Sequence, residues 1–178
     1  MNRSTQSRFL AFALALVMVF SMLPVTALAA EEAATATLVT DASTLAAGDQ
    51  VVIVASKYDY ALSTNQKTNN RGAAAITKAD TSITLTDEVQ ILTLEDGAVE
   101  DTFAFDTGSG YLYAAGQSKA QNGSKNNNHL KTTETLDANG SWSVEITDGI
   151  ASVIAKGENG CNVMQYNSGS TLFAAYSS

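Results

Sequence analysis

The only histidine of the chain lies at the end of a polar stretch whose residue types could do chemistry. Residues 110–132 read GYLYAAGQSKAQNGSKNNNHLKT, which places His129 directly after three asparagines. An imidazole is the side chain best suited to general acid–base work or metal binding near neutral pH. No second metal ligand and no activated serine or cysteine forms a recognisable motif beside it. We therefore expect a loop that ends at the start of a strand, with no catalytic residue, bound metal or cofactor.

The other reactive side chains favour structural roles as well. Cys161 is the only cysteine, so no disulfide can form within the chain, and an isolated cysteine is usually an inert, packed residue. Asp96 and Asp148 fall in equivalent turns, and the neighbours Glu100 and Asp101 would point to opposite faces of a strand. A small hydrolase is therefore the least favoured function.

The first 29 residues have the composition of a secretory signal peptide. Arg3 and Arg8 precede an apolar run at residues 9–23, and a small-x-small sequence follows at residues 27–29. An apolar run of about fifteen residues is too short to span a membrane, which takes about 20. We expect cleavage after Ala29, no membrane attachment afterwards, and a protein that is secreted or held at the cell surface.

The charge left after cleavage excludes one class of partner. The signal segment contains two of the ten basic residues and no acidic one, so 8 basic and 18 acidic residues remain and the net charge becomes −10. An acidic surface repels phosphate backbones. We therefore expect no direct binding to nucleic acid.

The pattern after the signal peptide predicts a short disordered lead at residues 30–37 and a single all-β domain at residues 38–178. Apolar residues alternate with polar ones in short runs broken by Gly, Asn, Asp and Ser. The clearest runs are residues 50–56, 88–95, 102–107, 141–147 and 150–156. Trp142 alternates with Val144 and Ile146 and is expected in the core. Only residues 41–49 favour a helical turn, with Asp41 as its N-cap.

The strands recur in three similar units. Asp96 and Asp148 are 52 residues apart, as are Leu112 and Met164, whereas Leu62 and Leu112 are 50 apart. Each unit has an Asp/Gly turn, a strand, a return strand, a polar loop and a short strand, and the first two units add a fourth strand. The third unit has no fourth strand before Ser178.

Three units of four strands predict a β-trefoil-like closed barrel. One unit cannot bury its apolar face alone, so the units must pack round a shared axis, and closure removes free sheet edges. The alternative is a β-sandwich of two sheets. Because the third unit lacks its fourth strand, we expect either a longer native protein or a partner that supplies the strand.

Tyrosines and asparagines are the residue types that could bind a ligand. The tyrosines fall in or beside the return strands and the asparagines in the loops that follow, and an aromatic face beside amide groups is typical of sugar and peptide recognition. The candidate ligand-binding residues are Tyr60, Asn70, Arg71, Tyr111, Tyr113, Asn128, His129, Tyr166 and Asn167. The alternative is that the tyrosines fill the rims of the barrel and the asparagines form turns.

Several segments together resemble a known kind of domain. They are TLVTDASTLAAGDQVVIVASKYDYALSTNQKTNNRGAAAIT, GSGYLYAA, LDANGSWSVEI and QYNSGSTLFAAYSS. Through these segments the chain resembles an uncharacterised accessory β-domain of large secreted multidomain proteins from Gram-positive gut-type bacteria. Such domains are found beside extracellular nucleases, phosphoesterases and Ig-like repeats. The resemblance implies a non-catalytic module followed by further domains of the same polypeptide, and it carries over no binding residues.

Two functions remain open on this reading. The first is an interaction or substrate-targeting module that binds a glycan or a cell-envelope polymer. The second is a structural spacer that binds nothing and holds its neighbouring domains apart.

Overall fold

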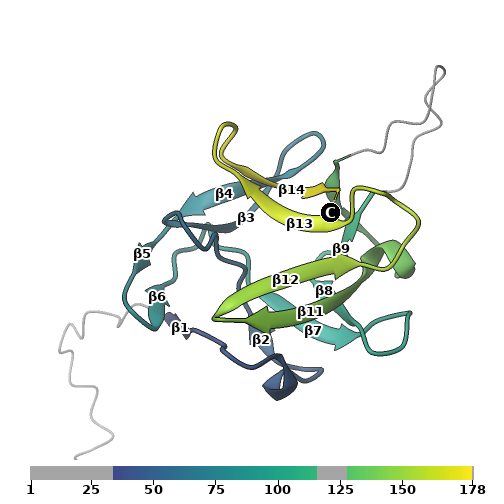
Figure 1. The fold of residues 1–178 in the computed structure, drawn as a ribbon. Coiled ribbons are helices and arrows are strands. Elements are labelled where there is room, and N and C mark those ends of the chain that lie inside the picture. The colour runs from purple at the N-terminus through teal and green to yellow at the C-terminus, as the bar shows by residue number, and fades with distance from the viewer. Residues whose placement is uncertain (1–33, 116–127, 178) are drawn as a thin grey trace, which may run out of the picture. The chain divides into compact units, whose positions relative to one another are not determined.

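The computed structural model describes residues 34–115 and 128–177, which are all-β (Figure 1). The predicted signal peptide lies outside the described residues. The strands are β1 (Thr35–Thr37), β2 (Gln50–Val51), β3 (Tyr60–Gln66), β4 (Arg71–Ala75), β5 (Thr77–Lys78), β6 (Ser82–Thr84), β7 (Leu92–Asp96), β8 (Phe103–Asp106), β9 (Tyr111–Ala114), β10 (Leu130–Thr133), β11 (Ser141–Thr147), β12 (Ile150–Ala155), β13 (Val163–Asn167) and β14 (Leu172–Tyr176). Two 3-10 helices, η1 (Ala42–Thr44) and η2 (Ala138–Gly140), complete the described elements.

Three antiparallel hairpins carry the repeated spacing of the sequence. β3 pairs with β4, β9 with β10, and β13 with β14. Leu62, Leu112 and Met164, which recur at intervals of about fifty residues, are all buried on the first strand of their hairpins. The periodicity therefore marks equivalent inward positions of three hairpins.

The ends of the three hairpins meet beside one another. The N–H of Leu130 donates to the carbonyl of Asn69 at 3.0 Å, and the N–H of Ala175 donates to the carbonyl of Asn128 at 3.3 Å. Strand β14 also pairs with β4 through Leu172 and Phe173. We call residues 69–72, 128–132 and 172–175 the hairpin junction.

A second set of strands pairs in the order β2, β7, β8, β11, β12. Every pairing in this set is antiparallel, and the hairpin of β11 and β12 turns at Asp148 and Gly149, which both have positive φ. No described strand joins β12 to β2. The predicted closure into a barrel is therefore wrong for the described residues, and open antiparallel sheets are also what a sandwich-like fold would contain.

The main core lies between the hairpins and this second set of strands. Trp142 is fully buried there and lies against Phe105, with ring centroids 6.1 Å apart. Leu92, Leu94 and Leu112 are buried in the same cluster. The prediction that Trp142 belongs to the core is confirmed.

A small sheet made by β1, β6 and β5 accompanies the first unit. Thr35–Thr37 pair with Ser82–Thr84, so the prediction of a disordered lead is wrong for residues 35–37, whose backbone finds a partner strand. Ile76, Ile83 and Val89 form a second apolar cluster beneath this sheet. The short strands of this sheet show no clear alternation of apolar and polar residues in the sequence.

The predicted helical turn is a single turn of 3-10 helix. The Asp41 carboxylate caps η1 by accepting hydrogen bonds from the Ser43 hydroxyl at 2.8 Å and from the Ser43 N–H at 2.9 Å. These two bonds, the one from the hydroxyl first, lower the pKa of Asp41. The turn ends at Leu45, earlier than predicted, because Leu45 is already extended.

Candidate functional site

Three tyrosines from the first and third hairpins make ring contacts with one another. The Tyr60 ring of β3 stacks on the Tyr166 ring of β13, with centroids 5.5 Å apart and planes at 18°. The Tyr58 ring, from the loop before β3, lies 5.2 Å from Tyr166 at 51°. We call Tyr58, Tyr60 and Tyr166 the tyrosine cluster.

The cluster is anchored on its inner side and open on its outer side. Tyr166 lies against Phe173 of β14, with centroids 5.3 Å apart, and both Tyr60 and Tyr166 pack against the main core. Tyr58 is 46% exposed. The protein thus presents to solvent the Tyr58 ring, which lies against Tyr166, and Tyr166 in turn stacks on Tyr60.

Lys78 of β5 fixes the loop that carries Tyr58. Its ammonium donates to the carbonyls of Ala55 and Tyr58, each at 2.6 Å, and to that of Ser56 at 3.3 Å. An ammonium has three donors, so three carbonyls of one turn account for all of them. The loop is held in one shape by the strand of the small sheet, and the Tyr58 ring is held with it.

Asn167 is next to Tyr166 in sequence, but its amide serves the hairpin turn. Its nitrogen donates to the hydroxyl of Tyr176 at 2.6 Å, and its oxygen accepts the N–H of Ser170 at 3.1 Å. Of the nine predicted binding residues, only Tyr60 and Tyr166 are in direct ring contact.

Asn70, Arg71, Asn128 and His129 gather instead at the hairpin junction. The side-chain oxygen of Asn70 accepts the N–H of Leu130 at 3.1 Å. The carbonyl of His129 accepts the N–H of Ala115 at 3.0 Å. The Asn70 bond joins the first two hairpins and the His129 bond extends the second hairpin, so both groups have a structural use.

The imidazole of His129 is partly buried just before β10, as the sequence predicted. Burial lowers the pKa of His129, and the positive charge of Lys131 lowers it further. The ring is therefore neutral near pH 7.

Arg71 differs most from the prediction, which placed it on a loop surface. It opens β4 and is only 3% exposed. Its Nη1 donates to the Thr132 hydroxyl at 3.4 Å and its Nη2 to the side-chain oxygen of Gln90, whereas its Nε has no hydrogen-bond partner. Burial lowers the pKa of Arg71. The guanidinium is a structural group held by neutral partners and is not presented to a ligand at the surface.

Tyr111 and Tyr113 lie on β9 and belong to the second hairpin. The hydroxyl of Tyr111 donates to the Glu95 carboxylate at 2.8 Å, and this hydrogen bond, together with the charge of Glu95, raises the pKa of Tyr111. Tyr111 therefore connects β9 to β7.

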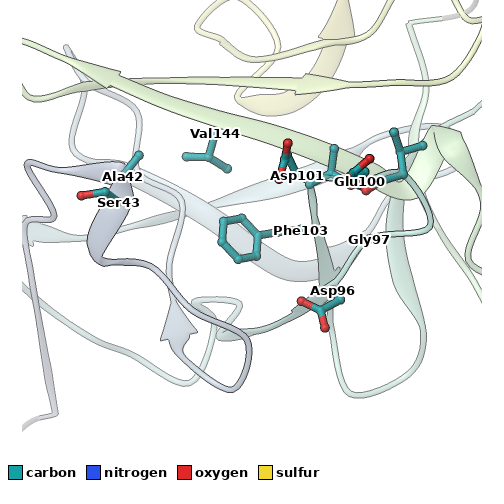
Figure 2. A pocket seen from close by; sticks show the side chains of 10 residues that line it. Ala42, Ser43, Asp96, Gly97, Glu100, Asp101, Phe103 and Val144 are labelled. Carbon is teal, nitrogen blue, oxygen red and sulfur yellow. Dashed lines mark hydrogen bonds between the residues drawn. The ribbon is translucent and has the colours of Figure 1, made fainter.

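A pocket of about 630 Å³ lies elsewhere, between η1, the turn before β8 and β11. Figure 2 shows the apolar side chains of Phe103 and Val144 and the carboxylates of Asp96, Glu100 and Asp101 around it. Its lining contains no basic residue. None of the predicted binding residues lines it.

The described residues contain neither a cluster of metal-ligating side chains nor a membrane-spanning helix. Within residues 34–115 and 128–177, no three His, Cys, Asp or Glu side chains lie together as metal ligands would. In the same part of the chain, no helix has the length and apolar character needed to cross a membrane.

Comparison of the chain with protein families, with curated proteins and with solved structures finds no match.

Two residues of the candidate site were not among the predicted ones. Tyr58 lies two positions before Tyr60, and residues at i and i+2 of an extended segment share a face, so the run YDY at residues 58–60 contained that signal. Lys78 had no such signal, because its partners are 20 to 23 residues away.

Proposed function

We propose that this chain is a secreted, non-catalytic β-domain that binds a glycan of the cell envelope through the tyrosine cluster. The observation that carries the proposal is the exposed Tyr58 ring, which lies against Tyr166 on a loop whose backbone carbonyls accept hydrogen bonds from the ammonium of Lys78. Aromatic rings provide a flat apolar surface with a polar hydroxyl at one end. A sugar ring, with C–H groups on one face and hydroxyls at its edge, matches both parts of such a surface.

The charge of the protein narrows the class of glycan. Eighteen acidic residues outnumber ten basic ones in the full chain, so a polymer rich in phosphate or carboxylate would be repelled. We infer that the ligand is a neutral or amino-sugar glycan and that each site binds it weakly. The domain would then act as a module that targets a larger extracellular protein to its substrate.

We also propose that the strands form three related units in a trefoil-like arrangement. The equivalent burial of Leu62, Leu112 and Met164 supports this view, as does the meeting of three hairpins at one junction. In this arrangement the tyrosine cluster lies where the first and third units adjoin.

The test is a glycan array and a pulldown with purified cell walls, using the domain and a Tyr58→Ala variant. Tyr58 is exposed, so its removal should change the free energy of unfolding by less than about 0.5 kcal/mol. Loss of about 1.4 kcal/mol of stacking would weaken binding about tenfold. Tyr113→Ala, a tyrosine of the second hairpin, is the matched control and should bind as the parent does.

Three outcomes would count against this assignment. Binding to no glycan and no cell-wall fraction would favour a structural spacer. Equal binding by the parent and Tyr58→Ala would remove the cluster from the site. Turnover of a glycoside or phosphoester by the pure domain would make it an enzyme.

A further inference from the structure

Strand β2 has an edge that no described strand occupies, and β12 has an edge that β13 occupies only at Ile154. In the proposed three-unit arrangement, β2, β8 and β12 are the first strands of their units. The middle one, β8, pairs with β7 along Phe103–Asp106 and with β11 through Phe103 and Ala104. β12 pairs with β11, the last strand of the unit before it, and β2 with β7, the last strand of its own unit. β8 thus has a strand on each side. One further strand placed between β12 and β2 would give both of them a second neighbour of the same kind.

The backbone of β12 faces that space. The N–H of Ala155 donates to the carbonyl of Asn162 at 2.9 Å, on the side away from β11. Backbone groups of successive residues in an antiparallel strand point to alternate sides, so those of Val153 and Ala151 also point away from β11. Pairing of β12 with β13 is confined to Ile154 and Val163. The edge at Ala151 is therefore available to an incoming strand.

Some apolar side chains on β2 and β12 are more exposed than those on β7, as expected if a neighbouring strand is missing. On β7, which has neighbours on both sides, Leu92 and Leu94 are completely or almost completely buried. On β2, Val51 is only partly buried although it packs against the same core. Ile150, at the start of β12, is 55% exposed. Apolar surface beside the two edges would be covered by an added strand.

The last strands of the first two units indicate what the incoming strand would contain. β7 has Leu92 and Leu94 at alternate positions, and β11 has Trp142, Val144 and Ile146. Two exposed acidic residues, Asp49 directly before β2 and Asp148 in the turn directly before β12, lie next to the two edge strands in the chain. An apolar residue at every second position would enter the core, and basic residues between them would meet this acidic rim.

We propose that the edges of β12 and β2 bind an extended peptide strand with large apolar residues at alternate positions and basic residues between them. The strand adds to the sheet by main-chain hydrogen bonds, and its alternate side chains supply specificity. This interaction surface is separate from the tyrosine cluster and rests on the proposed three-unit arrangement.

A synthetic peptide that copies residues 141–147 of β11, with Ser143→Lys and Glu145→Lys, is the probe, because its apolar residues alternate strictly with the two lysines. Its binding is measured by isothermal titration calorimetry, and its effect on the protein by thermal unfolding. A ligand that binds only the folded state at 100 times its Kd should raise the Tm of a domain of this size by about 5–10 °C. Hydrogen exchange of the Ala151 amide should slow when the peptide is bound.

Two controls test the strand geometry itself. A scrambled peptide without alternation and a peptide N-methylated on its pairing edge should bind at least tenfold more weakly. Ala151→Pro removes the edge N–H and should weaken binding to the same degree, because proline has no donor. The matched variant Ala151→Ser keeps the N–H and should bind as the parent does.

The outcomes separate this proposal from the glycan assignment. Tyr58→Ala should retain peptide binding in full, whatever it does to glycan binding. The proposal is overturned if the probe does not bind, or if scrambled and N-methylated peptides bind equally well. Concentration-dependent dimers in analytical ultracentrifugation that occupy the Ala151 edge would overturn it in favour of a second copy of the chain.

Discussion

The indole N–H of Trp142 donates to the backbone carbonyl of Leu112 at 2.9 Å. This bond joins β11 to β9 inside the main core, so the last strand of the second unit is tied to the hairpin of that unit. A buried carbonyl at the middle of a hairpin needs a partner, and the only tryptophan of the chain supplies it.

Trp142→Phe should lower the free energy of unfolding by about 2–4 kcal/mol. It leaves the Leu112 carbonyl without its donor, at a cost of about 1–3 kcal/mol, and opens a cavity in a core where Trp142 is fully buried. Urea unfolding followed by far-UV circular dichroism measures the change. A loss below about 0.5 kcal/mol, which is the usual effect of a surface change, would contradict the burial of this ring.

Gln90→Leu should be strongly destabilising, and Arg71→Met should suppress the effect. The buried guanidinium of Arg71 depends on the side-chain oxygen of Gln90, and a buried charge that loses a partner costs about 3 kcal/mol or more. Arg71→Met replaces the guanidinium by a thioether of similar length and so removes the buried charge that Gln90 hydrogen-bonds. A double-mutant cycle by urea unfolding gives the coupling energy, and additive single changes would show that the two side chains act independently.

Lys78→Met should loosen the Tyr58 loop while leaving the strands folded. The variant keeps the apolar stem but loses three hydrogen bonds to loop carbonyls, and we expect a loss of about 1–2 kcal/mol and faster amide exchange at residues 55–58. Lys57→Met, which changes an exposed lysine of the same loop, is the control and should change neither. Glycan binding should weaken in Lys78→Met alone.

His129 should make the protein less stable as the pH falls below neutrality. Burial holds the pKa of the folded imidazole below its ordinary value, so the unfolded chain takes up a proton first, at about pH 6.5. Stability is then lost as the pH falls through the unfolded pKa and levels off below the folded one. His129→Asn should remove this part of the loss in urea unfolding between about pH 7.5 and pH 5.5, and an unchanged pH profile would contradict it.

The repeated spacing predicted the all-β class and the places of three hairpins because it reflects burial, but it did not predict the open sheet. Leu62, Leu112 and Met164 recur at regular intervals since each must enter the same core, and alternation within the runs located most strands. The small sheet of β1, β6 and β5 was missed because strands of two or three residues are too short to show alternation. The order of the strands at the open edges depends on pairings between distant segments, which no local pattern encodes.

The sequence predicted only part of the candidate site, because the site also depends on contacts between distant segments. Tyrosine type and position pointed to Tyr60 and Tyr166, but their contact arises only when the first and third hairpins meet. Arg71 looked like a loop residue because polar residues surround it in sequence, whereas the junction of the hairpins buries it. Charge and polarity therefore located the loops correctly and misjudged which of their residues face solvent.

The ammonium that holds the Tyr58 loop also bears on how many of the proposed glycan sites one chain would have. Lys78 belongs to a small sheet that the described residues contain only beside the first unit. In the proposed three-unit arrangement, only the first unit has this sheet among the described residues, so we expect one sugar site per chain. Firm attachment to a long polymer then requires several such chains side by side, since linked weak sites gain strength through effective concentration.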